Sequence, residues 1–359
     1  MNIYLDDSGL RDNLYPLAEL RHVSDIRVGI LTIREKWERL LGCEIGDQRQ
    51  HPKPLDAMIR VPANWVPNAD CYEEMLALAQ SGHSLPAHLC HIQYAWDALR
   101  INGRAIQDDY LLVTKDKQSK PLGTNLRCIS PESIFIEEGV QLSHAFLNAS
   151  EGPIYLGNDV VVMEGVCIRG PFAAGEGTVI KMGASIYGAT SVGPYCTIGG
   201  EIKNSIIHSY SNKAHHGYLG DSYLGAWCNW GAGTSCSNVK NTGGLVQYRL
   251  PSNPTGIAAG TKAGVIMGDF SRTAINTSIN TGTIVGVSCH IFSRGFPSNY
   301  IPSFTWGNEN KYLIEKAIEH AANWKRQKNQ VLTDSEIQRL QACFHKHNPP
   351  SNSKNESTV

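Results

Sequence analysis

The chain has 359 residues, a hydrophobic fraction of 42% and a formal net charge of −1, so it is long enough for two or three domains with real cores. Such a balanced charge excludes a general basic surface for nucleic acid, and no apolar run reaches the roughly 18 residues that a membrane helix needs. We expect neither nucleic acid nor a membrane as a partner.

The ten cysteines show no zinc-finger spacing and no C-x-x-C pair, and the first seven residues are acidic rather than those of a secretory signal. These features predict reduced thiols, no metal site and a cytoplasmic protein.

Residues 1–130 have the pattern of a small α/β region. An opening strand covers residues 2–5, and helix patterns cover residues 34–41, 69–81 and 91–102. The cationic side chains of this region are interpreted as solvated or capping residues; they are Arg21, Arg27 and Arg34.

Residues 131–307 carry a six-residue repeat. Aliphatic or small residues recur at one position through eight hexads: Leu156, Val162, Ile168, Ala174, Ile180, Ile186, Val192 and Ile198. The position four further on is small or apolar throughout: Val160, Val166, Phe172, Thr178, Ala184, Thr190, Cys196 and Ile202. The period resumes later with Thr261, Met267, Thr273, Ile279, Val285 and Ile291.

A period of six matches neither an α-helix nor an alternating strand, but it suits a coil with flat faces and three hexads per turn. We therefore predict a mainly β chain whose central part, about residues 156–292, is a left-handed parallel β-helix.

Residues 308–347 are predicted to form C-terminal helices. Thr333 and Glu336 have the spacing of a capping box before the last helix. The polar residues 348–359 are predicted to be a disordered tail.

Polar groups gather where the repeat is predicted to break, at residues 209–218, as a loop displaced from the coil. His215 and His216 lie there, and a neutral imidazole can accept a proton from an attacking amine. Lys203 and Lys213 are candidates to hold a phosphate, and Tyr218 and Asn229 to hold sugar hydroxyls.

Several segments carry a resemblance to a known family. They are residues 11–17, 27–37, 212–215, 218–221 and 229–234. With the hexads, they make the chain similar to shortened GlmU-like proteins, which resemble the bacterial N-acetylglucosamine-1-phosphate uridyltransferase/glucosamine-1-phosphate acetyltransferase.

The resemblance implies a homotrimer that transfers an acetyl group from acetyl-CoA to an amino-sugar phosphate or nucleotide sugar, in a groove between subunits. It places His215 at the catalytic base, in preference to His216, because His215 keeps the spacing to Tyr218 and Asp221. The other matching positions are a phosphate-binding Lys203, the sugar-contacting Tyr218, Asn229 and Asn238, and a backbone contact of Ala232 to acetyl-CoA.

The chain departs from the family at Val239 and Gly244, where an aromatic residue and a lysine are expected. A family arginine further upstream has no counterpart in register, and Lys181 and Arg169 are candidates to replace it. Near the start, residues 6–9 include one glycine and two aspartates, which cannot cradle a triphosphate, although an aspartate can hold Mg²⁺ if nucleotide binds.

Two other functions stay open. One is a sugar-1-phosphate nucleotidyltransferase whose β-helix serves trimerisation and regulation, and the other is a non-catalytic β-helix scaffold. A cleft over residues 6–11 would favour the first, and a His215 packed in the core would favour the second.

Overall fold

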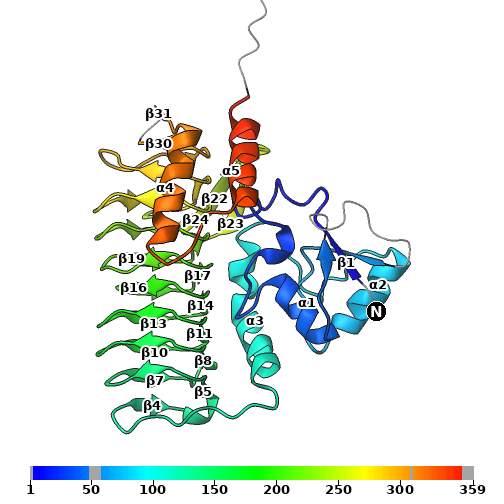
Figure 1. Ribbon diagram of the computed structural model, residues 1–359, viewed down its shortest axis with the longest axis vertical. Helices are drawn as coiled ribbons and strands as arrows, with labels where there is room; N and C mark the ends of the chain where they lie inside the picture. Colours follow the sequence, from blue (N-terminus) through cyan, green and yellow to red (C-terminus); the bar gives the residue numbers. More distant parts are fainter. Residues whose placement is uncertain (1–2, 48–57, 308–309, 350–359) are drawn as a thin grey trace, which may run out of the picture.

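Stacked triangular coils form the long axis of the molecule, and the N-terminal region packs along one side of them (Figure 1). The computed structural model describes residues 3–47, 58–307 and 310–349. The central part is a left-handed parallel β-helix, accompanied by a small α/β region and C-terminal helices, so the predicted fold class is confirmed.

Three sheets, parallel apart from one edge strand of the third, form the faces of the coil. The first face consists of β4 (Arg127–Ile129), β7 (Phe146–Asn148), β10 (Cys167–Arg169), β13 (Ser185–Tyr187), β16 (Glu201–Lys203) and β19 (Tyr218–Gly220). The second consists of β5 (Ile134–Ile136), β8 (Ile154–Leu156), β11 (Phe172–Ala174), β14 (Thr190–Val192), β17 (Ile206–Ile207), β20 (Tyr223–Leu224), β24 (Val265–Met267), β27 (Thr283–Val285) and β29 (Tyr300–Ile301).

The third face begins with β6 (Gln141–Leu142), β9 (Val161–Val162), β12 (Val179–Ile180), β15 (Thr197–Ile198) and β18 (Asn212–Lys213). It continues through an isolated bridge at Asn229 to β25 (Arg272–Thr273), β28 (His290–Ile291), β30 (Thr305–Trp306) and β31 (Asn310–Lys311). A separate pair, β21 (Ser235–Cys236) and β26 (Ser278–Ile279), stacks in the same parallel sense.

The register of the coil follows the hexads. Ile168 pairs with Ile186, and Ile180 with Ile198, so each rung there contains three hexads. These aliphatic side chains point inward and are at most 2% exposed. Each buried side chain of this size contributes roughly 1.5–3 kcal/mol, which explains why the six-residue period was readable in the sequence.

The later part of the repeat differs from the prediction. Thr261 is exposed, and the inward series that includes Met267 starts only after an inserted antiparallel hairpin, β22 (Val246–Leu250) and β23 (Asn253–Gly260). The predicted break at residues 209–218 is wrong, because β18 and β19 there continue the coil. The excursion therefore lies after Cys236.

The N-terminal region contains a three-stranded parallel sheet of β1 (Ile3–Asp6), β2 (Gly46–Asp47) and β3 (Ile59–Pro62) in the order β2-β1-β3. Its helices are α1 (Ile33–Leu41), α2 (Tyr72–Ser81) and α3 (Asp97–Thr114), and single 3₁₀ turns cover Val23–Asp25 and Pro131–Ser133. Helix α3 begins later than the pattern indicated because the Asp97 carboxylate accepts the backbone N–H groups of Gln93 and Tyr94.

Helix α3 runs along the second face of the coil (Figure 1). Asn102 bonds the carbonyl of Ala189 at 2.9 Å and the hydroxyl of Ser191 at 2.9 Å. Gly103 permits this approach, because a Cβ there would lie 3.3 Å from the Cβ of Ala189. The second face is therefore covered within one chain.

The interpretation of three arginines as solvated or capping residues is wrong. Arg21 is buried and forms an ion pair with Asp269 of the coil. Arg27 is also buried, and its guanidinium donates a hydrogen bond to the carbonyl of Ile30. Arg34 donates to the Asp25 carboxylate at 2.8 Å. A charge without a partner is too costly to bury, so each guanidinium here marks a structural contact.

Helices α4 (Ile314–Arg326) and α5 (Asp334–His347) pack on the upper coils through a cluster that includes Trp227, Phe304 and Phe344. The capping box is confirmed, since Thr333 and Glu336 each bond the other's backbone N–H. Most of the predicted tail, residues 350–359, lies outside the described residues. Within the described chain, no helix combines the length and the apolarity needed to span a bilayer.

Candidate active site

His215 lies at an exposed corner of the coil, on the turn that joins β18 of the third face to β19 of the first face. His216 beside it is exposed as well. Because the flanking strands are paired in the coil, the two imidazoles are carried by a rigid turn rather than by a displaced loop. His215 is not packed in the core, so the observation that would favour a scaffold is not met.

Lys213 supports this corner from inside the coil. It takes an inward position opposite Ile198 and is 2% exposed. Its Nζ donates to the carbonyls of Gly199 at 2.9 Å and His215 at 2.6 Å. The prediction that Lys213 holds a phosphate is therefore wrong, because its ammonium points into the protein and holds the backbone beneath His215.

Burial of Lys213 lowers the pKa of its ammonium to about 8, against the attraction of the Glu201 carboxylate. Gly200 makes room for this arrangement. Its φ is +69°, and a Cβ there would lie 2.9 Å from the Lys213 Nζ and 2.6 Å from the His215 carbonyl. A side chain at position 200 would displace the corner.

The corner is stacked with neighbouring rungs. Continuing the pairing of Ile180 with Ile198 and of Ile198 with Lys213 places Met182, Gly200 and His215 above one another. The Asn212–Asn229 bridge places Ala232 beside His215, and the N–H of Gly233 donates to the His216 carbonyl at 3.0 Å. The structure thus brings predicted residues Ala232 and His215 together.

Lys203, Tyr218 and Asn238 gather on and beside the first face. Lys203 is on β16, with its Nζ 5.6 Å from the ring centroid of Tyr187. Tyr218 is on the neighbouring strand, and its hydroxyl accepts a hydrogen bond from Asn238 Nδ2 at 3.1 Å. Burial and then the Asp221 carboxylate raise the pKa of Tyr218 well above its usual value, so the phenol stays neutral.

Asn229 stands apart from this group on the third face. Its Oδ1 accepts from Asn212 Nδ2 at 3.4 Å, and its backbone bridges to Arg272. Within one chain, Asn229 therefore faces a different side of the prism from Tyr218.

Two polar residues that sequence reasoning had not assigned to the site complete the first-face group. Asn204 donates to Asp221 Oδ1 at 2.6 Å, and Asn238 donates to the other carboxylate oxygen of Asp221. The three residues are spaced by 17 positions, the length of one coil at this height. That equal spacing of Asn, Asp and Asn is the signal that could have identified them.

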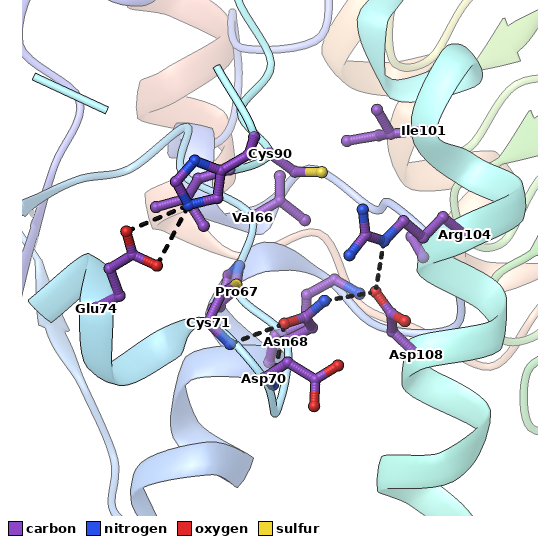
Figure 2. Close-up of a pocket in the computed structure, with 14 residues that line it drawn as sticks. Val66, Pro67, Asn68, Asp70, Cys71, Glu74, Cys90, Ile101, Arg104 and Asp108 are labelled. Atoms are coloured by element: carbon purple, nitrogen blue, oxygen red, sulfur yellow. Dashed lines mark hydrogen bonds and ion pairs between the residues drawn. The ribbon is translucent and has the colours of Figure 1, made fainter. Parts of the chain in front are cut away.

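A second candidate site is a cavity of about 200 Å³ in the N-terminal region, between α3 and the segment around α2 (Figure 2). Several of its polar groups are already paired: Asn68 donates to Asp108 at 2.8 Å, and His88 lies 3.2 Å from the Glu74 carboxylate. Ligand pockets usually span about 300–1,000 Å³, so this cavity is small for a nucleotide, and none of residues 6–11 lines it.

Comparisons with known proteins support the family resemblance. Residues 2–87 match the family described as sugar nucleotidyl transferase. The chain is 32% identical over 119 residues to the bifunctional protein GlmU of Methanocaldococcus jannaschii, covering 33% of this chain and 29% of that protein. It is 26% identical over 227 residues to the GlmU of Synechococcus elongatus, covering 56% and 45%.

A solved structure of Arabidopsis UDP-N-acetylglucosamine acyltransferase is 16% identical, covers 66% of this chain and 86% of that chain, and has a TM-score of 0.24, too low to support an argument. The chain spans less than half the length of the two GlmU relatives. The family match and the two GlmU matches confirm the similarity to GlmU-like proteins that the motifs predicted.

Proposed function

We propose that this chain is an acetyltransferase that moves an acetyl group from acetyl-CoA to the amine of an amino-sugar phosphate or nucleotide sugar, with His215 as the general base. The observation that carries the proposal is the exposed His215 on a rigid corner, held through its carbonyl by buried Lys213 at 2.6 Å and flanked by the Lys203–Tyr218–Asn238 group. Similarity to the bifunctional GlmU proteins supports a transferase reaction.

The proposed step is an acyl transfer. The amine nitrogen of the acceptor attacks the thioester carbonyl, forming a C–N bond, and the C–S bond breaks as the tetrahedral intermediate collapses. The proton leaving the nitrogen passes to the imidazole of His215, and CoA leaves as a thiolate that takes up a proton. A general base at this position typically contributes on the order of 10²–10⁴-fold to the rate.

The neighbouring side chains would bind the substrates. The Lys203 ammonium is the cation for the acceptor phosphate, since Lys213 is unavailable. Tyr218 and Asn238 form a hydrogen-bonded pair suited to sugar hydroxyls. In the proposal, Asn229 reaches the sugar from another subunit's side of a groove, and Ala232 contacts acetyl-CoA through its backbone.

We further propose that the active form is a homotrimer. The first face leaves large apolar side chains exposed, with Phe146 at 54% and Ile129 at 55%. They line a groove of about 560 Å³ that runs down the coils below the His215 corner. A second copy of the chain that covers this face would bury them and place its third face beside the first face of the neighbouring copy.

The test measures CoA release from acetyl-CoA with a panel of amino-sugar phosphates and nucleotide sugars. His215→Ala should lower the rate by about 10²–10⁴-fold, whereas His216→Ala, an equally exposed neighbour, should keep most of it. An unchanged rate in His215→Ala would reject His215 as the base. Light scattering of the same samples should show a mass of three chains, and Phe146→Glu should lower it.

A second candidate function is nucleotidyl transfer, which the family match over residues 2–87 favours. The residues near the start fit Mg²⁺ poorly. Asp7 is paired with Arg11 at 2.7 Å and lies 3.6 Å from His22, and Asp6 is paired with Arg60. We derive no step through Mg²⁺, and pyrophosphate release from UTP with a sugar-1-phosphate would establish this activity.

We retain the cytoplasm as the proposed location. The ten cysteines, all present as unpaired thiols, are compatible with a reducing compartment.

A further inference from the structure

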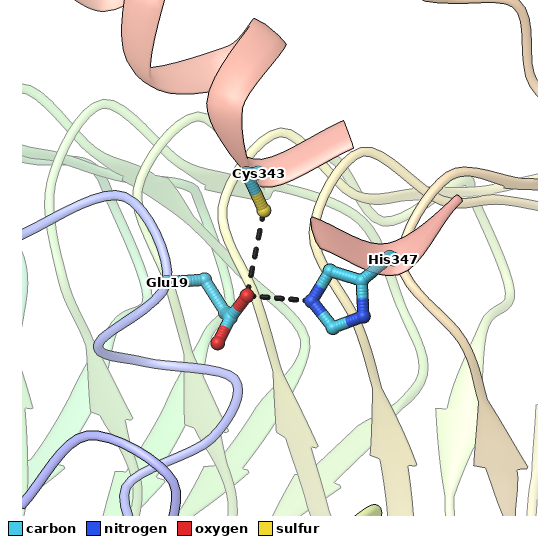
Figure 3. A group of neighbouring side chains, drawn as sticks. All are labelled: Glu19, Cys343 and His347. Atoms are coloured by element: carbon cyan, nitrogen blue, oxygen red, sulfur yellow. Dashed lines mark hydrogen bonds and ion pairs between the residues drawn. The ribbon is translucent and has the colours of Figure 1, made fainter. Parts of the chain in front are cut away.

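Three side chains able to ligate a metal meet where the end of α5 docks on the N-terminal segment (Figure 3). Cys343 and His347 are four residues apart, so they lie on the same side of the helix. Glu19 comes from a segment more than 300 residues earlier in the chain and points at both of them. None of the residues of the His215 corner belongs to this cluster.

The contacts converge on one oxygen. His347 Nε2 lies 2.6 Å from Glu19 Oε2, and the Cys343 Sγ donates to the same oxygen at 3.4 Å. All three ligand atoms lie within 4.8 Å of one another. In a tetrahedral zinc site such atoms are about 3.3–3.6 Å apart, a separation that small side-chain rotations reach from here.

The backbone on both sides is held in place by packing. Leu340 and Phe344 of α5 are buried in the same cluster as Leu20, the residue after Glu19. The side chain of Glu19 is 3% exposed and that of His347 is 15% exposed, so the group is shielded but reachable from solvent. Preorganised ligands of this kind lower the cost of binding an ion.

Lys346 and Asp12 are charged neighbours of the cluster. Lys346 Nζ donates to Glu19 Oε1 at 3.0 Å and lies 3.7 Å from the Asp12 carboxylate. It occupies the carboxylate oxygen that faces away from Cys343 and His347. A hydrogen bond to the second oxygen of a ligating carboxylate is the usual way in which a metal ligand is oriented.

We propose that Glu19, Cys343 and His347 bind one Zn²⁺ ion. Thiolate, imidazole and carboxylate are ligands that Zn²⁺ accepts, and three protein ligands leave a fourth position for water. On binding, Cys343 loses its thiol proton to solvent, so one thiolate and one carboxylate neutralise the ion. The ion would join the N-terminal segment to the last helix. This proposal differs from the expectation of no metal site, which considered cysteine spacing alone.

The experiment uses the full-length protein, stripped with a chelator and then titrated with Zn²⁺ against a chromophoric competitor. Wild type should bind one equivalent tightly, and Co²⁺ in its place should show a thiolate charge-transfer band. Cys343→Ser and His347→Ala should each weaken binding by at least about 100-fold. His345→Ala, which removes an exposed imidazole from the same helix, should bind as wild type does.

Glu19→Gln, which keeps the size of the side chain, provides a variant that should fold even if a helix variant does not, and it should also lose the tight site. The proposal is overturned if wild type binds no tight Zn²⁺, if His347→Ala binds as well as His345→Ala, or if the Co²⁺ complex lacks the thiolate band. Any of these results would mean that Glu19, Cys343 and His347 form only a hydrogen-bonded cluster.

Discussion

Replacing the buried Lys213 by methionine should change how the stability of the coil depends on pH. The folded chain lowers the pKa of this ammonium from 10.5 to about 8 because burial removes it from water. At 1.36 kcal/mol per pKa unit, burying the charged ammonium lowers the free energy of unfolding by about 3 kcal/mol.

The sign follows from proton binding in the two states. Below pH 8 both states carry the proton and the full cost applies, whereas between pH 8 and 10.5 the unfolded chain binds the proton that the folded chain has lost. Rising pH therefore removes the cost. Between pH 7 and 10, wild type should gain about 2–3 kcal/mol relative to Lys213→Met.

The assay is urea unfolding at pH 7, 8, 9 and 10, followed by far-ultraviolet circular dichroism, which reports on the secondary structure of the whole chain. Using the difference between wild type and variant removes the contributions of the buried cysteines and tyrosines, which titrate in the same range. Lys262→Met, at an exposed lysine, is the matched control and should follow wild type. Parallel pH profiles for wild type and Lys213→Met would refute the reasoning.

Three further predictions concern stability. Asp269→Ala should lower the free energy of unfolding by about 3–5 kcal/mol because it leaves the buried Arg21 without its partner. The double variant Arg21→Met/Asp269→Leu should regain most of that stability in urea denaturation, and no gain would contradict the ion-pair explanation. Ile186→Ala should cost about 2–5 kcal/mol through a cavity in the coil, whereas Ser185→Ala on the exposed side of the same strand should change the urea midpoint little. Thr333→Ala should cost roughly 1 kcal/mol by removing the cap of α5, and an unchanged hydrogen-exchange rate in the first turn of α5 would show that the cap contributes nothing.

The sequence by itself determined the coil. Its hexad period comes from inward side chains such as Ile168 and Ile186, which are apolar because every rung buries them. It also determined the last helix, since the Thr333–Glu336 box is a local interaction. These features depend on neighbours along the chain or on a strict repeat, so a pattern is enough to find them.

Tertiary structure decided the polar contacts. The sequence alone suggests an accessible Lys213, but the strand register places this residue opposite Ile198 inside the coil. It likewise suggests a solvated Arg21, but the fold pairs this residue with Asp269. Glu19 meets Cys343 and His347 only after α5 has docked. Such pairs are separated by long stretches of chain, and the energy that selects them comes from burial, which no local pattern encodes.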